Sequence, residues 1–137
     1  MRYLNIIFII LLLKPLVVNS QNKITIEIGQ LQNNKGEVLF LLMDINKNIV
    51  QELSGNIKGN KCNIYIENIK TGKYAFKYFH DENKNKKLDT NWISIPKEGY
   101  GFSNNAKGKF GPPEFDKMVF EITNDTTIKC SPNYITF

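Results

Sequence analysis

The sequence is poor in the residues that most enzyme active sites need. It contains one histidine, His80, and two cysteines, Cys62 and Cys130, in 137 residues. No C-x-x-C pair is present, so a spacing common to zinc sites and thiol oxidoreductases is missing. The sequence leaves open whether the cysteines form a disulfide or stay as two buried thiols, because pairing needs Cα atoms within about 7 Å. A cysteine-dependent active site is therefore disfavoured.

Runs of like charge are also absent. The formal net charge is +5, and the lysines are scattered along the chain. Loss of Arg2 and Lys14 with the leader described below lowers the charge by two, to +3. A basic balance this mild favours solubility over nucleic-acid binding. Nucleic acid is therefore not an expected partner.

The one long apolar run lies at the start of the chain. Residues 6–13 are all apolar, Arg2 precedes them, Lys14-Pro15 interrupts the run, and a small residue, Ser20, stands before Gln21. This layout is typical of a secretory signal peptide, whereas a transmembrane helix needs roughly 20 apolar residues. We predict a signal peptide over residues 1–20, and one periplasmic or secreted domain over 21–137 with no membrane span after cleavage.

After the leader, no window of eleven residues has a helical period. Instead, alternation of apolar and polar residues predicts strands, as where Ile24, Ile26 and Ile28 alternate with Thr25 and Glu27. Gly, Asn and Pro separate the predicted strands, which cover 23–31, 36–44, 62–69, 72–79, 117–123, 126–130 and 133–137. We predict an all-β fold, a single antiparallel β-sandwich of Ig-like or transthyretin-like type with one long ordered loop.

That loop covers residues 80–113 and has no long strand pattern. A structureless loop of this length is uncommon in a compact domain unless it is functional or disordered. Its apolar residues argue against disorder. We expect Trp92, Tyr100, Phe102 and Phe110 to fold inward as a small core beneath the loop. The alternative is a flat platform that binds a sugar or a peptide.

The segment HDENKNKKLDTN, residues 80–91, has oxygen-bearing side chains at alternate positions. Asp81, Asn83 and Asn85 occupy offsets 1, 3 and 5, the Lys87 carbonyl occupies offset 7, and Asp89 occupies offset 9. Calcium takes six to eight oxygen ligands, and loops with this spacing supply them. This spacing makes Asp81, Asn83, Asn85, Lys87 and Asp89 candidate ligands of a calcium ion in the 81–89 loop.

Three features weaken this prediction. Offset 6, which is glycine in an EF-hand, is Lys86, and offset 12, which is glutamate, is Trp92. The residues before the loop have a strand pattern, so an EF-hand is excluded. The charges of the three acids and three lysines in residues 81–89 cancel, so any calcium site there would be weak, with a millimolar Kd. Glu98 is the candidate for the missing carboxylate if the chain folds back. We therefore favour a turn in which Asp and Asn side chains cap their own backbone, with calcium binding as the alternative.

A hydrolase using His80, Asp81 and Ser103 is the competing enzyme hypothesis. Ser103 lies in GYGFSNN, but the pattern G-x-S-x-G fails at Asn105, and no strand-to-helix context follows. A single histidine at the end of a strand more often orders a loop. We attribute the glycines at 99 and 101 to left-handed turn geometry.

Two long segments, HDENKNKKLDTN and IPKEGYGFSNNAKGKFGPPEF, resemble the signature of a family of exported bacterial proteins known only as a domain of unknown function, number 2141. The resemblance extends over the mature chain and implies export and a small β-sandwich, with no established activity. Lys84 and Lys86 depart from it, because family members tend to have glycines there. A shorter stretch, IKTGKYAFKY, is similar to transthyretin-like and carboxypeptidase-regulatory-like domains.

Together these features predict an exported, non-catalytic binding or accessory module of unknown ligand, with the 81–89 loop as a candidate Ca²⁺ site. Its expected partner is an extracytoplasmic protein, a peptide or a carbohydrate. The alternatives are the hydrolase and a structural envelope protein.

Overall fold

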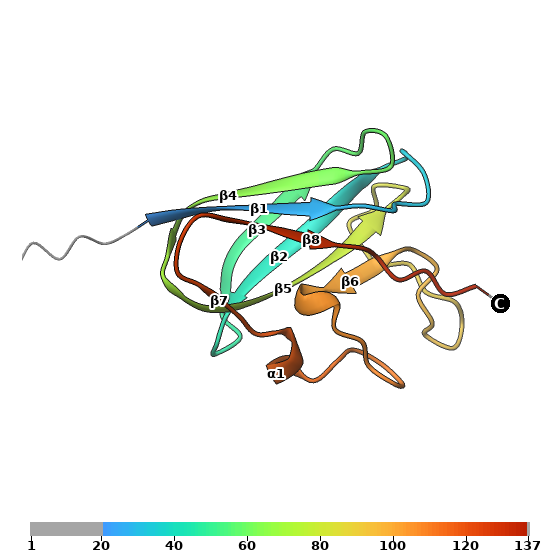
Figure 1. The fold of residues 1–137 in the computed structure, drawn as a ribbon. Helices are drawn as coiled ribbons and strands as arrows, with labels where there is room; N and C mark the ends of the chain where they lie inside the picture. Colours follow the sequence, from blue (N-terminus) through green and yellow to red (C-terminus); the bar gives the residue numbers. More distant parts are fainter. Residues whose placement is uncertain (1–20, 137) are drawn as a thin grey trace, which may run out of the picture.

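A computed structural model describes residues 21–136 as two packed β-sheets (Figure 1). A three-stranded sheet has the order β4-β1-β8, and a larger sheet has the order β3-β2-β5-β6, with β7 also paired to β5. The predicted all-β sandwich is therefore confirmed. The predicted signal peptide lies outside the described residues. The strands are β1 (Gln21–Ile28), β2 (Glu37–Asp44), β3 (Ile49–Gly55), β4 (Cys62–Lys70), β5 (Gly72–Asp81), β6 (Tyr100–Phe102), β7 (Phe120–Ile122) and β8 (Thr126–Cys130).

The smaller sheet is centred on β1, whose period-two pattern buries alternate isoleucines. Ile24, Ile26 and Ile28 are each at most 1% exposed and face the larger sheet. β1 pairs antiparallel with β4 and parallel with β8. The sandwich is thus antiparallel except for the β1–β8 pair.

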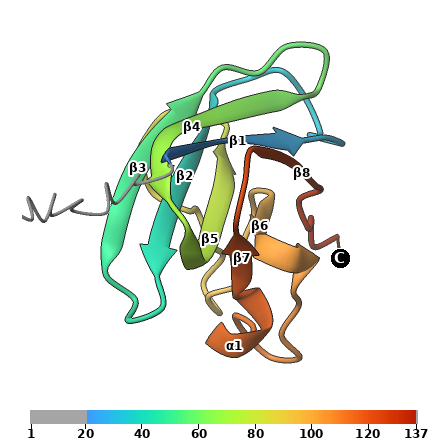
Figure 2. The ribbon, with the colours of Figure 1, turned by 60° about the vertical axis from the view of Figure 1, so that its left-hand side comes forward.

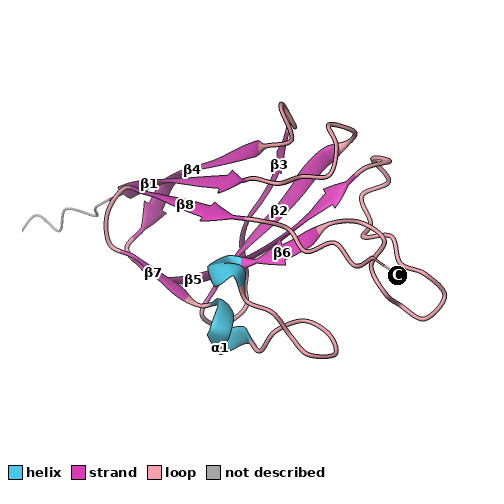
Figure 3. Cartoon of the chain, turned by 45° about the vertical axis from the view of Figure 1, so that its right-hand side comes forward, coloured by secondary structure: helices cyan, strands magenta, loops and turns pink. Residues whose placement is uncertain are grey.

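The larger sheet buries one face in the core and covers part of the other. From β2 and β5, the side chains of Val38, Phe40, Phe76 and Tyr78 point inward, and Phe40 stacks at 5.0 Å from Phe76 between ring centroids. On the outer face, a second apolar cluster forms around Met43, Ala75 and Met118. Residues 103–118 cover this cluster. They contain a 3₁₀ turn (Ser103–Asn105) and the short helix α1 (Phe115–Met118), and Figure 3 shows α1 below β5.

Three features of the strand prediction were wrong. The exposed edge strand β3 and the three-residue β6 were missed, because neither has a clear alternation of apolar and polar residues. Residues 133–137 were predicted as a strand, but the described part forms only a single bridge between Tyr100 and Asn133. Figure 2 shows β6 beside β5, so the predicted long loop is divided by a short strand.

No helix within residues 21–136 is long and apolar enough to cross a membrane.

The two cysteines are free, buried thiols. Both pair with Ile28, one from each side of β1. Two strand spacings separate their Cα atoms by about 10 Å, which exceeds the limit of about 7 Å for a disulfide. Burial raises the pKa of Cys62 to about 11, and that of Cys130 also to about 11.

We predict that neither thiol of the folded protein reacts with a thiol reagent at pH 8 and that both react in concentrated guanidinium chloride. The free energy of unfolding should fall as the pH rises from 9.0 toward about 11, since the unfolded thiols ionise first. A double variant, Cys62→Ala with Cys130→Ala, should lose the early part of this fall. Isolation of a folded protein without free thiols would contradict the prediction.

Candidate functional site

The loop after β5 is built around a buried carboxylate. Asp81 ends β5 and is 0% exposed. Its Oδ1 accepts a hydrogen bond from the Asn85 N–H at 3.1 Å, and its Oδ2 accepts one from the Lys86 N–H at 2.8 Å. A buried charge needs such partners, and a hydrogen bond to a charged group contributes about 1.5–3 kcal/mol. Asp81 thus turns the chain back on itself immediately after the strand.

Two asparagines continue the turn. The Asn83 Oδ1 accepts from the Asn85 N–H at 3.1 Å, and the Asn85 Oδ1 accepts from the Lys87 N–H at 2.9 Å. Lys84 lies between these asparagines, and Lys86 follows the second one. Both lysines adopt left-handed backbone conformations, with φ of 58° and 65°. The loop therefore has the sharp turn for which glycine is usually required, here made with lysine.

Asp89 closes the loop. Its two carboxylate oxygens accept hydrogen bonds from the side-chain amides of Asn83, at 2.6 Å, and Asn85, at 2.9 Å. The structure thus brings together Asp81, Asn83, Asn85 and Asp89, the side chains that the sequence singled out. Lys87 enters the network through its N–H, whereas the prediction used its carbonyl.

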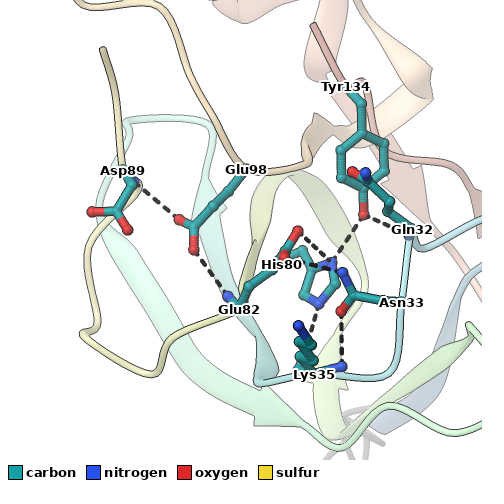
Figure 4. Close-up of polar contacts among 8 residues, drawn as sticks. All are labelled: Gln32, Asn33, Lys35, His80, Glu82, Asp89, Glu98 and Tyr134. Carbon is teal, nitrogen blue, oxygen red and sulfur yellow. Dashed lines mark hydrogen bonds and ion pairs between the residues drawn. The ribbon is translucent and has the colours of Figure 1, made fainter. Parts of the chain in front are cut away.

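Glu98 folds back onto the start and end of this loop (Figure 4). It is 5% exposed, and its carboxylate accepts from the Glu82 N–H at 2.9 Å and from the Asp89 N–H at 3.0 Å. The Glu98 side chain therefore lies at the loop, as expected from the sequence. Its observed contacts are with backbone N–H groups, so it fastens both ends of the turn.

The side chain of Lys86 is directed away from the oxygen cluster. The Lys86 ammonium forms an ion pair with Glu37 on β2. The hydrogen bond from Lys86 lowers the pKa of Glu37, and the nearby charges of Lys86 and Lys84 add to this effect. The side chain of Lys86 therefore ties the loop to the outer face of the larger sheet.

His80 joins three distant segments and is 0% exposed (Figure 4). Its Nε2 lies 2.7 Å from the Lys35 carbonyl oxygen and its Nδ1 lies 2.9 Å from the Tyr134 hydroxyl. That hydroxyl also accepts from the Gln32 N–H at 2.9 Å. Because a carbonyl can only accept, Nε2 carries the proton. His80 therefore links β5, the turn before β2 and the C-terminal segment.

Ser103 is buried elsewhere and is used structurally. Its Oγ accepts from the Phe76 N–H at 3.0 Å and donates to the Met118 carbonyl oxygen at 2.5 Å. Phe76 and His80 are four residues apart along β5, and both nitrogens of the His80 ring already have partners. The residues proposed for a hydrolase are thus not brought together as a nucleophile and its base.

The aromatic residues of the long loop divide into two groups. Phe102 packs against the outer apolar cluster that contains Met118. The Tyr100 ring contacts the Phe102 ring edge-to-face, with 6.1 Å between their centroids. Trp92 is 93% exposed and Phe110 is 103% exposed. The expected inward core is therefore wrong for Trp92 and Phe110.

The glycines at 99 and 101 have a different role from the one expected, because neither has a positive φ. A Cβ at Gly99 would lie 2.4 Å from the Tyr134 ring, and one at Gly101 would lie 2.3 Å from the Tyr78 hydroxyl. These positions need a small residue because tyrosine rings pack against the backbone.

Within residues 21–136, no group of three or more His, Cys, Asp or Glu side chains lies close enough to hold a metal ion. The oxygen cluster of the loop contains two carboxylates and two amides, so any cation there would depend on asparagine oxygens.

A family model matches residues 26–129. The chain belongs to the family of uncharacterized proteins conserved in bacteria, DUF2141. This match includes the Asp81 loop, Glu98 and Ser103, and it confirms the resemblance found in the sequence. No curated protein matches the chain.

Neither partner of His80 could be inferred from the sequence. Lys35 and Tyr134 are 45 and 54 residues away along the chain. The only local signal was that a single histidine at a strand end often orders a loop.

We predict that His80→Ala lowers the free energy of unfolding by about 2–4 kcal/mol, because it opens a cavity and leaves two polar groups without their partner. Tyr134→Phe should cost about 1–2 kcal/mol, and the two substitutions should be non-additive in a double-mutant cycle. Urea denaturation measures both. A loss for His80→Ala no greater than that of the exposed control Lys73→Ala would contradict the prediction.

The left-handed backbone conformation of Lys84 gives a second prediction. Lys84→Gly should raise the free energy of unfolding by about 0.5–1 kcal/mol, because glycine adopts a φ of 58° without strain. Lys87→Gly removes the same charge at a residue without positive φ, and should destabilise the protein by about 0.5–1 kcal/mol. Chemical denaturation of the two variants checks the opposite signs. Equal effects would show that charge, and not backbone conformation, governs this loop.

Proposed function

We propose that the protein is a non-catalytic binding module that acts outside the cytoplasm, with a weak calcium site in the 81–89 loop. The convergence of Asp81, Asn83, Asn85 and Asp89 on one small volume is the observation that carries this proposal. Carboxylate and amide oxygens are ligands that calcium prefers, and Lys86 has the backbone turn of offset 6 in calcium loops.

The side-chain amides of Asn83 and Asn85 donate hydrogen bonds to Asp89, on the side where a bound cation would lie. A half-turn of an amide group exchanges its oxygen and nitrogen. Reorientation of Asn83 and Asn85 would therefore present oxygens, together with Asp89, to a bound cation. It would also give up the hydrogen bonds that the two side-chain oxygens accept from the Asn85 and Lys87 N–H groups, which is consistent with a weak site. The ion pair of Lys86 with Glu37 directs one positive charge away from this centre, which favours the same proposal.

The proposed binding role rests on the segment that Asp81 and Glu98 hold in place. Asp81 and Glu98 hold the 82–98 segment against one end of the larger sheet, although few buried apolar side chains come from it. Ordered loops supported by a rigid sandwich commonly carry binding sites. The full use of His80 and Ser103 in hydrogen bonds favours binding over hydrolysis.

We predict that calcium at about ten times a millimolar Kd stabilises the mature protein by about 1.4 kcal/mol, which raises its Tm by several degrees. Magnesium at the same concentration should have less effect, because it requires near-ideal octahedral geometry. Differential scanning calorimetry in matched ionic strength measures both.

Asp89→Asn should abolish the calcium shift, and the matched control Asp116→Asn, an exposed carboxylate on α1, should retain it. An unchanged Tm in calcium, or the same shift in both variants, would remove the metal from the proposal.

A further inference from the structure

The outer face of the larger sheet carries a groove beside the 81–89 loop. Its volume is about 640 Å³. The strand register places two rows of outward side chains across it, one formed by Ser54, Leu39, Phe79 and Tyr100, and the other by Glu52, Leu41, Lys77 and Phe102. Lys86 and Leu88 of the loop line the same groove.

The groove has an apolar floor that remains partly accessible. Leu39, Leu41, Phe79, Tyr100 and Phe102 are all half-buried, whereas the inward residues of the same strands are buried in the core. Four strands at about 4.8 Å spacing make the floor about 14 Å long across the sheet. This length suits a short peptide and is small for a protein–protein interface.

Two opposite charges stand on this floor. Glu52 and Lys77 flank Leu41 on neighbouring strands, about 10 Å apart across two strand spacings. Within residues 21–136, neither charge has an ion-pair partner, whereas Lys86 at the edge is paired with Glu37. A ligand that offers a positive group to Glu52 and a negative group to Lys77, with apolar atoms between them, would match the charge and polarity of this floor.

We propose that this groove binds a short peptide in the polyproline II conformation, with a basic residue and an acidic residue three positions apart. In that conformation, residues i and i+3 lie on the same side, about 9.3 Å apart at 3.1 Å per residue, close to the separation of Glu52 and Lys77. Grooves lined by aromatic residues recognise such peptides because little entropy is lost on binding.

Other ligand classes fit the groove less well. A fatty acid would satisfy Lys77 but would place its chain against the Glu52 carboxylate. A sugar needs many hydrogen-bonding groups, and besides its charges the floor offers mainly the hydroxyls of Ser54 and Tyr100. The inference rests on the proposed binding role of the protein, but it does not require calcium.

The test uses the mature protein labelled with ¹⁵N and four synthetic peptides. The probe is acetyl-Pro-Lys-Pro-Leu-Asp-Pro-amide. Its controls replace the charged pair with Gln and Asn, with two lysines, or with Glu and Asp. NMR titration should show shifts at the groove residues, and the charged probe should bind about two- to fivefold more tightly than the neutral peptide, as for exposed ion pairs.

Charge reversal makes the test specific. Lys77→Glu should bind the dibasic peptide best, and Glu52→Lys should bind the diacidic peptide best. Lys70→Glu, a matched reversal on the edge strand β4 of the other sheet, should keep the preference of the natural protein. The NMR spectrum of each variant also verifies its fold.

The inference would be overturned by no shifts at the groove residues, by the same peptide preference in all variants, or by decanoate binding in the groove that is indifferent to Glu52→Lys. Peptide shifts at Trp92 and Phe110 in place of the groove would also overturn it, while leaving the proposed binding role intact. Titrations with calcium and with EDTA separate the two proposals, because groove binding in both conditions supports this inference even if the calcium effect fails.

Discussion

The buried carboxylate of Asp81 is the interaction on which the middle of this chain depends. A charge that is 0% exposed is costly unless hydrogen bonds compensate it, and here the N–H groups of Asn85 and Lys86 do so. The requirement fixes the direction of the chain as it leaves β5. Glu98 then fastens the two ends of the turn through the N–H groups of Glu82 and Asp89. Two carboxylates thus organise a segment that contributes little to the apolar core.

The same turn connects the core to the accessible surface. On the inner side of β5, the neighbouring His80 ties the strand to Lys35 and Tyr134. On the outer side, Lys86 pairs with Glu37 and forms one edge of the groove. One short sequence therefore orders the loop, links it to the core and forms one edge of the groove. Lys86 supplies this ion pair from a left-handed conformation in which glycine would be less strained.

The sequence predicted the parts of the structure that depend on local periodicity and spacing. The alternating isoleucines of β1 specify a strand, and the Asx spacing specifies how Asp81, Asn83, Asn85 and Asp89 converge. The sequence did not predict β3, because an exposed edge strand has little apolar alternation. It also did not predict the parallel pairing of β1 with β8, since those residues are separated by most of the chain. Local patterns carry no information on such long-range contacts, and for the same reason Tyr134 was missed.

Exposure of aromatic residues was the least predictable feature. Trp92, Phe102 and Phe110 have similar apolarity, yet only Phe102 lies where the α1 segment can cover it. Whether a side chain is buried depends on which segment returns to cover it. That return is set here by hydrogen bonds of Ser103 and Asn104 to residues 117–119 and to β5, which apolar patterns do not encode.

Amide hydrogen exchange tests the central claim most directly. The N–H groups of Glu82, Asn85, Lys86 and Asp89 lie in an irregular loop, and each is bound by a carboxylate of Asp81 or Glu98. If these two carboxylates hold the loop, all four amides exchange far more slowly than unstructured ones, and Glu98→Gln accelerates Glu82 and Asp89 most. Exchange of the four amides at the rate of an unfolded peptide, while β1, β2 and β5 stay protected, would contradict the account.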